Sequence, residues 1–178
     1  MDTYSYTFEE YESDVKSLKE ILSDIENLHL VAVYRGSIPL VVHLSNLLDC
    51  EMSIIKLQTS NGCETKPQFL SNNIKEKDNL VVIEDIYDTG KTIGLIQGLM
   101  EKEYNNHSVS YYSLFGKKND VGVIYLKEKN NNWVIFPWEI YETSSALLEK
   151  GIQGEALVSM GLPRRVVEEI DRLAKTRK

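Results

Sequence analysis

Two adjacent carboxylates, Glu84 and Asp85, are followed by a short polar turn over residues 88–92. Carboxylates accept hydrogen bonds from sugar hydroxyls or bind Mg²⁺, but they repel a phosphate. The turn has the opposite chemistry, because its backbone N–H groups and hydroxyl donors favour an anion. A phosphorylated ribose needs both kinds of site side by side. The spacing therefore predicts a site for a phosphorylated sugar.

The turn lies between a predicted strand and a predicted helix. Residues 80–83 are apolar and mostly β-branched, which is typical of a strand buried on both faces, and we expect this strand to end at the carboxylate pair. The apolar residues that recur at helical spacing after the turn are Ile93, Ile96, Leu99 and Met100. Gly90 lets the backbone approach a ligand, and Thr89 and Thr92 add hydroxyl donors. The loop amides and the positive end of the helix then point at one spot that suits a phosphate.

Other motifs share parts of this segment. Gly90-Lys91-Thr92 is similar to the end of a Walker A loop, but that loop needs a glycine five residues earlier, where the chain has Asp85. Asp88-Thr89-Gly90 also occurs in aspartic proteases, which use two such aspartates, and the chain has one copy. An acidic helix cap is the simplest structural alternative, although a cap needs one such residue rather than the whole run.

The run from Ile83 to Thr92 resembles the phosphoribosyl-pyrophosphate (PRPP) signature of type I phosphoribosyltransferases. The resemblance implies a Rossmann-like α/β fold with a parallel twisted sheet flanked by helices and a small base-binding hood. It also implies Asp88 as general base for a purine proton or as stabiliser of a cationic sugar. The residues that it assigns to PRPP are Arg35, Gly36, Glu84, Asp85, Asp88, Thr89, Gly90, Lys91 and Thr92.

A second strand, turn and helix precede this signature. Residues 29–34 are a buried-strand candidate, and Arg35-Gly36-Ser37 follows before a helical run through Leu48. The arginine offers a planar fork for phosphate oxygens, and the glycine exposes backbone N–H. A surface arginine in an ordinary loop is the alternative. The turn resembles the family's pyrophosphate loop, in which an unusual cis peptide is found and a second glycine often stands where this chain has Ser37.

The remaining segments supply the other elements of the predicted fold. An amphipathic helix should begin near Thr7, with Glu10 completing a capping box. The apolar residues expected on its core face are Phe8, Tyr11, Val15, Leu18, Ile21, Leu22 and Ile25. After a short strand at residues 53–57, the chain is polar over residues 58–78. In the resembling family a mobile loop that closes over the active site lies here, and an extra hairpin is the alternative.

Lys117 follows a strand candidate at residues 109–115, ahead of another at residues 121–126. It could donate to a purine 6-oxo group, whereas a lysine in a turn is usually only exposed. The order Leu-Phe-Gly-Lys at residues 114–117 resembles the family's base-recognition lysine.

Residues 133–139 resemble the Trp-aliphatic and Pro-Trp-acid run of xanthine–guanine phosphoribosyltransferases. The resemblance implies that Trp133 stacks on the purine, that Val134 offers its backbone to the base edge and that Glu139 lies near a second Mg²⁺. Asp85 is the other predicted metal ligand. Two tryptophans buried in the core are the alternative.

Composition sets further limits. The 178 residues carry 20 Lys and Arg against 27 Asp and Glu, and this net charge of −7 argues against broad nucleic-acid binding. No run approaches about 18 apolar residues and no signal peptide is recognisable, so we expect no membrane partner. Cys50 and Cys63 make neither a disulfide framework nor a zinc pattern, which favours a reduced, cytoplasmic setting.

The resemblance implies a phosphoribosyltransferase domain over residues 1–142, with the mobile loop at about 58–78. Residues 143–178 are expected to form a helical extension, packed on the domain or at an oligomer interface. From Pro163 onward this extension is basic, with six Lys or Arg against three Asp or Glu.

The activity expected from the resemblance is transfer of the 5-phosphoribosyl group from PRPP to a purine base, with Mg²⁺. The products would be a nucleoside 5′-monophosphate and pyrophosphate. The base is guanine, xanthine or hypoxanthine, and the sequence does not choose among them. A regulatory protein that binds PRPP without transferring the group is the alternative. We expect a homo-oligomer, either a dimer or a tetramer.

Overall fold

The computed structural model describes residues 3–59, 65–117, 122–130 and 132–176. The chain divides into two compact units, Ser13–Lys129 and Met1–Glu12 together with Asn130–Lys178. No helix within these described ranges is both long and apolar enough to cross a membrane.

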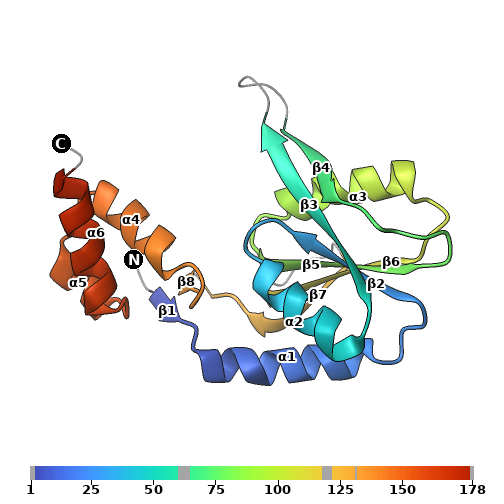
Figure 1. Cartoon of the computed structure of the whole chain (residues 1–178), viewed down its shortest axis with the longest axis horizontal. Coiled ribbons are helices and arrows are strands. Elements are labelled where there is room, and N and C mark those ends of the chain that lie inside the picture. The colour runs from blue at the N-terminus through green and yellow to red at the C-terminus, as the bar shows by residue number, and fades with distance from the viewer. Residues whose placement is uncertain (1–2, 60–64, 118–121, 131, 177–178) are drawn as a thin grey trace. The chain divides into compact units, whose positions relative to one another are not determined.

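The unit Ser13–Lys129 is an α/β sheet flanked by helices (Figure 1). The strand order is β4-β3-β2-β5-β6-β7, and every neighbouring pair is parallel except β3 and β4. This architecture confirms the predicted fold class. Its elements in chain order are β2 (Leu28–Val33), α2 (Ile38–Leu48), β3 (Glu51–Thr59), β4 (Thr65–Ser71), β5 (Asn79–Tyr87), α3 (Lys91–Glu103), β6 (Val109–Gly116) and β7 (Val123–Glu128).

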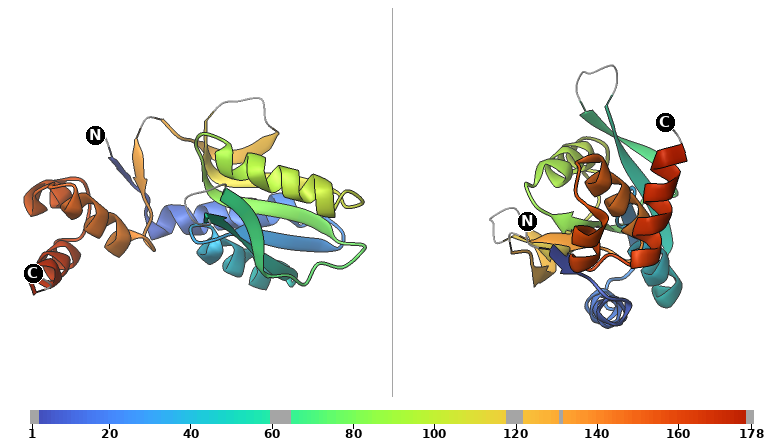
Figure 2. Two further views of the ribbon diagram at one scale, coloured as in Figure 1. Left: turned by 90° about the horizontal axis from the view of Figure 1, so that it is seen from above. Right: turned by 90° about the vertical axis from the view of Figure 1, so that its left-hand side faces the viewer.

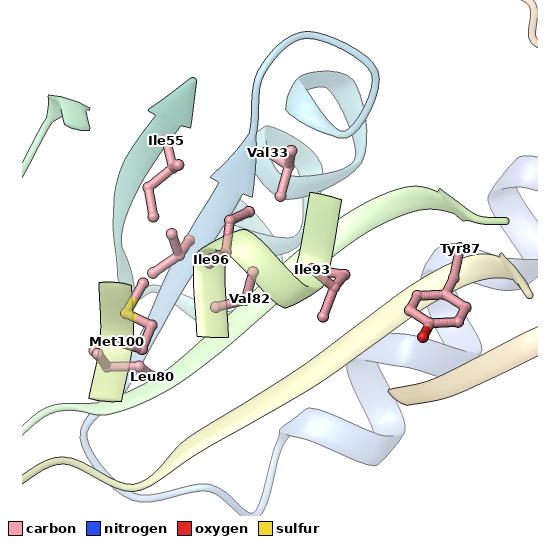
Figure 3. Packing of buried hydrophobic residues seen from close by; sticks show 9 residues of the cluster. Val33, Ile55, Leu80, Val82, Tyr87, Ile93, Ile96 and Met100 are labelled. Carbon is pink, nitrogen blue, oxygen red and sulfur yellow. The ribbon is translucent and has the colours of Figure 1, made fainter. Parts of the chain in front are cut away.

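Helix α3 covers one face of the sheet through a buried apolar cluster (Figure 3). Alternation along β2 and the first half of β5 directs every second side chain to this face. The strand residues of the cluster are Val31, Val33, Ile55, Leu80, Val82 and Tyr87, and the helix contributes Ile93, Ile96 and Met100. Helix α2 packs on β2 and β3, and Figure 2 shows it on the opposite side of the sheet from α3. The cluster therefore fixes α3, and with it the turn that precedes the helix.

Helix α1 (Phe8–Leu22) begins with the predicted capping box. The Thr7 backbone N–H donates to Glu10 Oε2 at 2.9 Å, and the Glu10 N–H donates to Thr7 Oγ1 at 3.2 Å. Of the residues predicted on its core face, Phe8 and Ile21 are exposed, which corrects that part of the prediction. They lie at the edges of the apolar stripe, where helical periodicity alone does not separate core from surface.

The polar stretch at residues 58–78 contains a strand, so the hairpin alternative is correct for its described part. Strand β4 pairs antiparallel with β3 at the edge of the sheet, with Pro67 opposite Leu57. An edge position tolerates a proline because one side of the strand has no ladder partner. Residues 60–64 lie outside the described ranges, and the role of this segment as a closing loop stays a prediction.

The other unit joins two short strands to a helical segment. Strand β1 (Thr3–Ser5) is parallel to β8 (Trp133–Ile135). The helices are α4 (Ile140–Glu149), α5 (Gly154–Ser159) and α6 (Arg164–Thr176). They share an apolar core with β8 whose buried members are Ile135, Leu147, Leu157, Leu162 and Val167.

Candidate functional site

The parallel strands β2, β5, β6 and β7 carry polar residues at their carboxyl ends. In open α/β sheets this edge is the usual ligand-binding edge. The loops after β2 and β5, together with Lys117 after β6, belong to the same compact unit. Most of the predicted site residues therefore lie within Ser13–Lys129.

Strand β5 continues past the carboxylate pair, contrary to the predicted end at Glu84 and Asp85. Ile86 and Tyr87 still pair with β6, opposite Phe115 and Gly116. Strand β5 extends this far because its partner β6 is long enough to continue the hydrogen-bonded ladder. The length of that partner cannot be predicted from the periodicity of the β5 sequence. The carboxylates therefore lie on a strand held by its neighbour rather than in a free loop.

Helix α3 begins at Lys91, so the polar turn is shorter than predicted. Gly90 occupies the N-cap position with φ of 75°, a left-handed conformation that favours glycine. A Cβ on Gly90 would lie 2.5 Å from the buried Tyr87 hydroxyl, which leaves no room for a side chain. The Thr89 hydroxyl accepts the Lys91 N–H at 3.4 Å. The result is a tight strand-to-helix turn whose amides begin a helix, the geometry that suits a phosphate.

The loop after β2 contains the cis peptide that the resemblance implies, between Tyr34 and Arg35. Ser37 fixes this loop from inside: its fully buried hydroxyl donates to the Val33 carbonyl at 2.9 Å and accepts the Val33 N–H at 2.8 Å. The side chain of Arg35 is exposed. The serine that replaces the family's frequent glycine therefore ties the loop to its own strand.

Gly36 lies directly against the carboxylate of Asp85. A Cβ at residue 36 would overlap the Asp85 carboxylate, closer than real Cβ atoms approach other groups. Two segments that are far apart in sequence, the loop after β2 and the carboxylate pair, are therefore in direct contact.

Burial dominates the electrostatics of the carboxylate pair. Burial, and then the charge of Asp85, raise the pKa of Glu84 to about 8, although a hydrogen bond from the Thr92 hydroxyl acts in the opposite direction. Burial also raises the pKa of Asp85, against hydrogen bonds from its own N–H and that of Ile86. A buried carboxylate next to a partly buried one favours a cation or hydroxyl donors as ligand.

The pair also fits Mg²⁺ delivered with a ligand. Among the described residues, no group of three or more His, Cys, Asp and Glu side chains is placed to hold a metal by itself. Mg²⁺ commonly binds one or two carboxylates and completes its octahedral shell with water and substrate phosphates. Glu84 and Asp85 match that requirement.

Asp88, at the start of the turn, lies between two ammonium groups. Lys117 Nζ is 2.5 Å from Asp88 Oδ1, and Lys129 Nζ is 3.0 Å from Oδ2. Hydrogen bonds from Lys117 and then Lys129 hold the pKa of Asp88 below its usual value. The site thus has an anionic part at the carboxylate pair and a cationic part around Asp88.

The remaining predicted site residues belong to the other compact unit. Trp133 is 40% exposed, and the Lys150 ammonium lies 5.4 Å from the centre of its ring. Val134 is buried, and Glu139 occupies the N-cap position of α4. Their predicted roles toward a base and a metal stay predictions.

Comparison with known proteins identifies the family of the chain. Residues 10–143 match the family model of the phosphoribosyl transferase domain. The chain belongs to this phosphoribosyl transferase family. The match begins within α1 and ends within α4, and it includes both loops described above and the strands that carry them.

Solved structures share the fold of this phosphoribosyl transferase domain. A purine phosphoribosyltransferase from Pyrococcus horikoshii is 24% identical with a TM-score of 0.64, over 78% of this chain and 95% of that chain. The xanthine-guanine-hypoxanthine phosphoribosyltransferase of Helicobacter pylori is 22% identical with a TM-score of 0.66, over 79% and 96%. A hypoxanthine phosphoribosyltransferase from Staphylococcus aureus is 19% identical with a TM-score of 0.55, over 71% and 77%.

Sequence reasoning missed two residues of this phosphoribosyl transferase site, Ser37 as a loop anchor and Lys129 as a partner of Asp88. Lys129 follows β7, and the carboxyl ends of parallel strands meet at one edge. The available signal was weak, because Lys129 lies three residues past the strand predicted at residues 121–126, and the observed β7 ends two residues later than that prediction.

Proposed function

We propose that the chain transfers the 5-phosphoribosyl group from PRPP to a purine base and releases pyrophosphate. One observation carries the proposal: a single compact unit holds the carboxylate pair with Glu84 buried, Gly36 against Asp85, and the Gly90 turn that begins α3. A diol, a pyrophosphate and a 5-phosphate are the parts of PRPP that these features suit.

Each part of PRPP then has a proposed partner. The backbone of the Asp88–Thr92 turn and its hydroxyls bind the 5-phosphate, because amides at the start of a helix favour an anion. Glu84 and Asp85 bind the ribose hydroxyls, and Arg35 with the Gly36 amide binds the pyrophosphate. Mg²⁺, when bound with PRPP, neutralises the charge that builds on the leaving pyrophosphate.

For the acceptor we propose a 6-oxopurine. Lys117, just after β6, would donate to the 6-oxo group, which accepts but does not donate. Trp133 is proposed to stack on the purine ring, Val134 to offer its backbone to the base edge, and Glu139 to act as a metal ligand. Substitution of Trp133 by Ala should then raise the KM for the base more than that for PRPP.

The test is incubation of the protein with PRPP, Mg²⁺ and guanine, xanthine or hypoxanthine in turn, with nucleotide and pyrophosphate both quantified. Uracil and orotate serve as control bases, and an Asp85→Asn variant as control protein. Equal amounts of purine nucleotide and pyrophosphate support the proposal. Binding of PRPP without product from any purine contradicts the transferase proposal and favours a PRPP-binding regulator. Absence of PRPP binding contradicts both the transferase and the regulator.

We further propose that the chain assembles as a homo-oligomer. Leu47 on helix α2 is exposed over 53% of its surface and is the apolar side chain that we propose for a subunit contact. Sedimentation velocity should give a dimer or tetramer, and Leu47→Asp should shift the distribution toward monomer. A monomer at micromolar concentration would contradict this proposal.

A further inference from the structure

The Asp88 carboxylate has a separate ammonium partner for each oxygen, and the two partners come from different strand ends. Lys117 lies after β6 and contacts Oδ1, whereas Lys129 lies after β7 and contacts Oδ2. Because each lysine contacts its own carboxylate oxygen, the loss of one contact does not by itself remove the other.

The two lysines differ in how firmly they are held. The Lys117 side chain is 42% exposed and that of Lys129 is 13% exposed. The Lys129 backbone N–H donates to the Gly116 carbonyl at 2.6 Å. A Cβ on Gly116 would overlap the Tyr125 ring, so β6 and β7 are closely packed at this point. Lys129 is therefore the fixed partner, and Lys117 the accessible one.

We propose that Lys129 is a positioning residue that keeps Asp88 ionised and in place while Lys117 turns to the base. This inference rests on the proposed transfer to a purine. Asp88 then enters the reaction as a carboxylate, next to the positive charge that develops on the ribosyl ring.

The charges around Asp88 support this division of roles. Among the described residues, the charged groups that act on its carboxylate are Lys117 and Lys129, and both favour the ionised form. In the transfer, the bond from C1′ to the pyrophosphate oxygen breaks and its electron pair leaves with pyrophosphate. The purine nitrogen supplies the electron pair of the new bond, and its proton passes to the Asp88 carboxylate or to water.

The role of Lys129 is tested by measuring the ionisation of Asp88 directly, without any substrate. In the wild type and in variants, NMR follows the ¹³C signal of the Asp88 carboxyl group from pH 2 to pH 7. Lys129→Met should raise the titration midpoint by about 0.5–1 pH unit, because an opposite charge nearby lowers the pKa of a carboxyl group. Lys129→Arg keeps the charge and should leave the midpoint close to that of the wild type.

Lys127→Met is the matched control. Lys127 lies on β7 two residues before Lys129, and its Nζ contacts Asp14 Oδ2 at 3.1 Å rather than Asp88. This variant should leave the Asp88 midpoint unchanged. An unchanged midpoint in Lys129→Met, or an equal shift in Lys127→Met, would overturn the proposal.

A kinetic readout then tests the role in the transfer. In a pH profile of kcat/KM for the base, the acid limb should move to higher pH in Lys129→Met, whereas Lys127→Met should keep the wild-type profile. An acid limb at the same pH in Lys129→Met would overturn the role. Failure of the proposed function is distinguishable, because the wild type would then form no nucleotide while the Asp88 titration still reports the effect of Lys129.

Discussion

The backbone of Gly36 lies against the carboxylate of Asp85, with no space for a Cβ between them. This contact joins the loop after β2 to the carboxylate pair on β5. The two residues are distant in sequence, but Gly36 follows β2 and Asp85 lies on β5, and these two strands are adjacent and parallel. The contact defines the position of the Asp85 carboxylate, so a side chain at residue 36 must displace it.

Gly36→Ala should therefore weaken binding of PRPP with Mg²⁺ by about tenfold, because displacing the Asp85 carboxylate removes a contact worth roughly 1.4 kcal/mol or more. Overpacking should also lower the free energy of unfolding by about 1–3 kcal/mol. Calorimetric titration and urea unfolding measure the two effects. Gly98→Ala is the control, since a Cβ on this exposed α3 glycine meets nothing within 4 Å. Equal PRPP affinities in wild type and Gly36→Ala would refute the role of the contact.

Glu84→Gln should stabilise the fold at high pH. The pKa of Glu84 is about 8 in the folded protein, against 4.5 for an ordinary glutamate, so the folded state binds the extra proton. That stabilisation is fully present below about pH 4.5 and is lost as the pH rises through 8. Relative to wild type, the free energy of unfolding of Glu84→Gln in urea should therefore increase by about 1–3 kcal/mol as the pH is raised from 5 to 9. Exposed Glu76→Gln should show no such gain, and a pH-independent difference for Glu84→Gln would count against a buried carboxylate.

His29 should make stability fall in acid. It is buried, with Nδ1 3.1 Å from Asp78 Oδ2 and Nε2 2.8 Å from Ser53 Oγ, and burial lowers its pKa from 6.5. The unfolded chain therefore gains the proton first, and stability decreases as the pH falls below about 6.5. In wild type, the free energy of unfolding in urea should be lower at pH 5.5 than at pH 7.5. In His29→Gln this difference, the pH slope of stability, should be smaller. His43→Gln, at an exposed histidine of α2, should retain it, and identical slopes in all three proteins would disprove the assignment.

Asp88→Asn should reduce turnover more than PRPP affinity, because it removes the charge but keeps the shape of the side chain. We expect kcat to fall by about a hundredfold or more, with the KM for PRPP changed by less than about tenfold. Asp14→Asn is the control, since Asp14 contacts Lys127 on the same unit. Unchanged turnover in Asp88→Asn would remove Asp88 from the reaction.

The sequence was sufficient to predict the parts of the site that are local. The β5 strand, the turn and α3 follow one another in the chain, so their apolar spacing and turn residues predict them. The capping box of Thr7 and Glu10 is local for the same reason. The cis peptide before Arg35 was available only through the family resemblance.

Features that depend on strand order or length were beyond the sequence. The contact between Lys129 and Asp88 requires β7 to lie beside β6, and β6 beside β5. The extension of β5 to Tyr87 depends on how far β6 runs, and the β4 strand alternates weakly at an edge where burial imposes little pattern. The Gly36 contact likewise joins two strands that the sequence does not show to be neighbours.

The central claim is that the carboxylate pair and the turn at the start of α3 together bind PRPP. The most direct measurement is an NMR titration of the ¹⁵N-labelled protein with PRPP and Mg²⁺, following each backbone amide. We predict that the amides of residues 88–92 and of Gly36 shift most, and that ribose without phosphates leaves those of residues 88–92 unmoved. PRPP binding that leaves these amides unchanged, or no binding at all, would contradict the account.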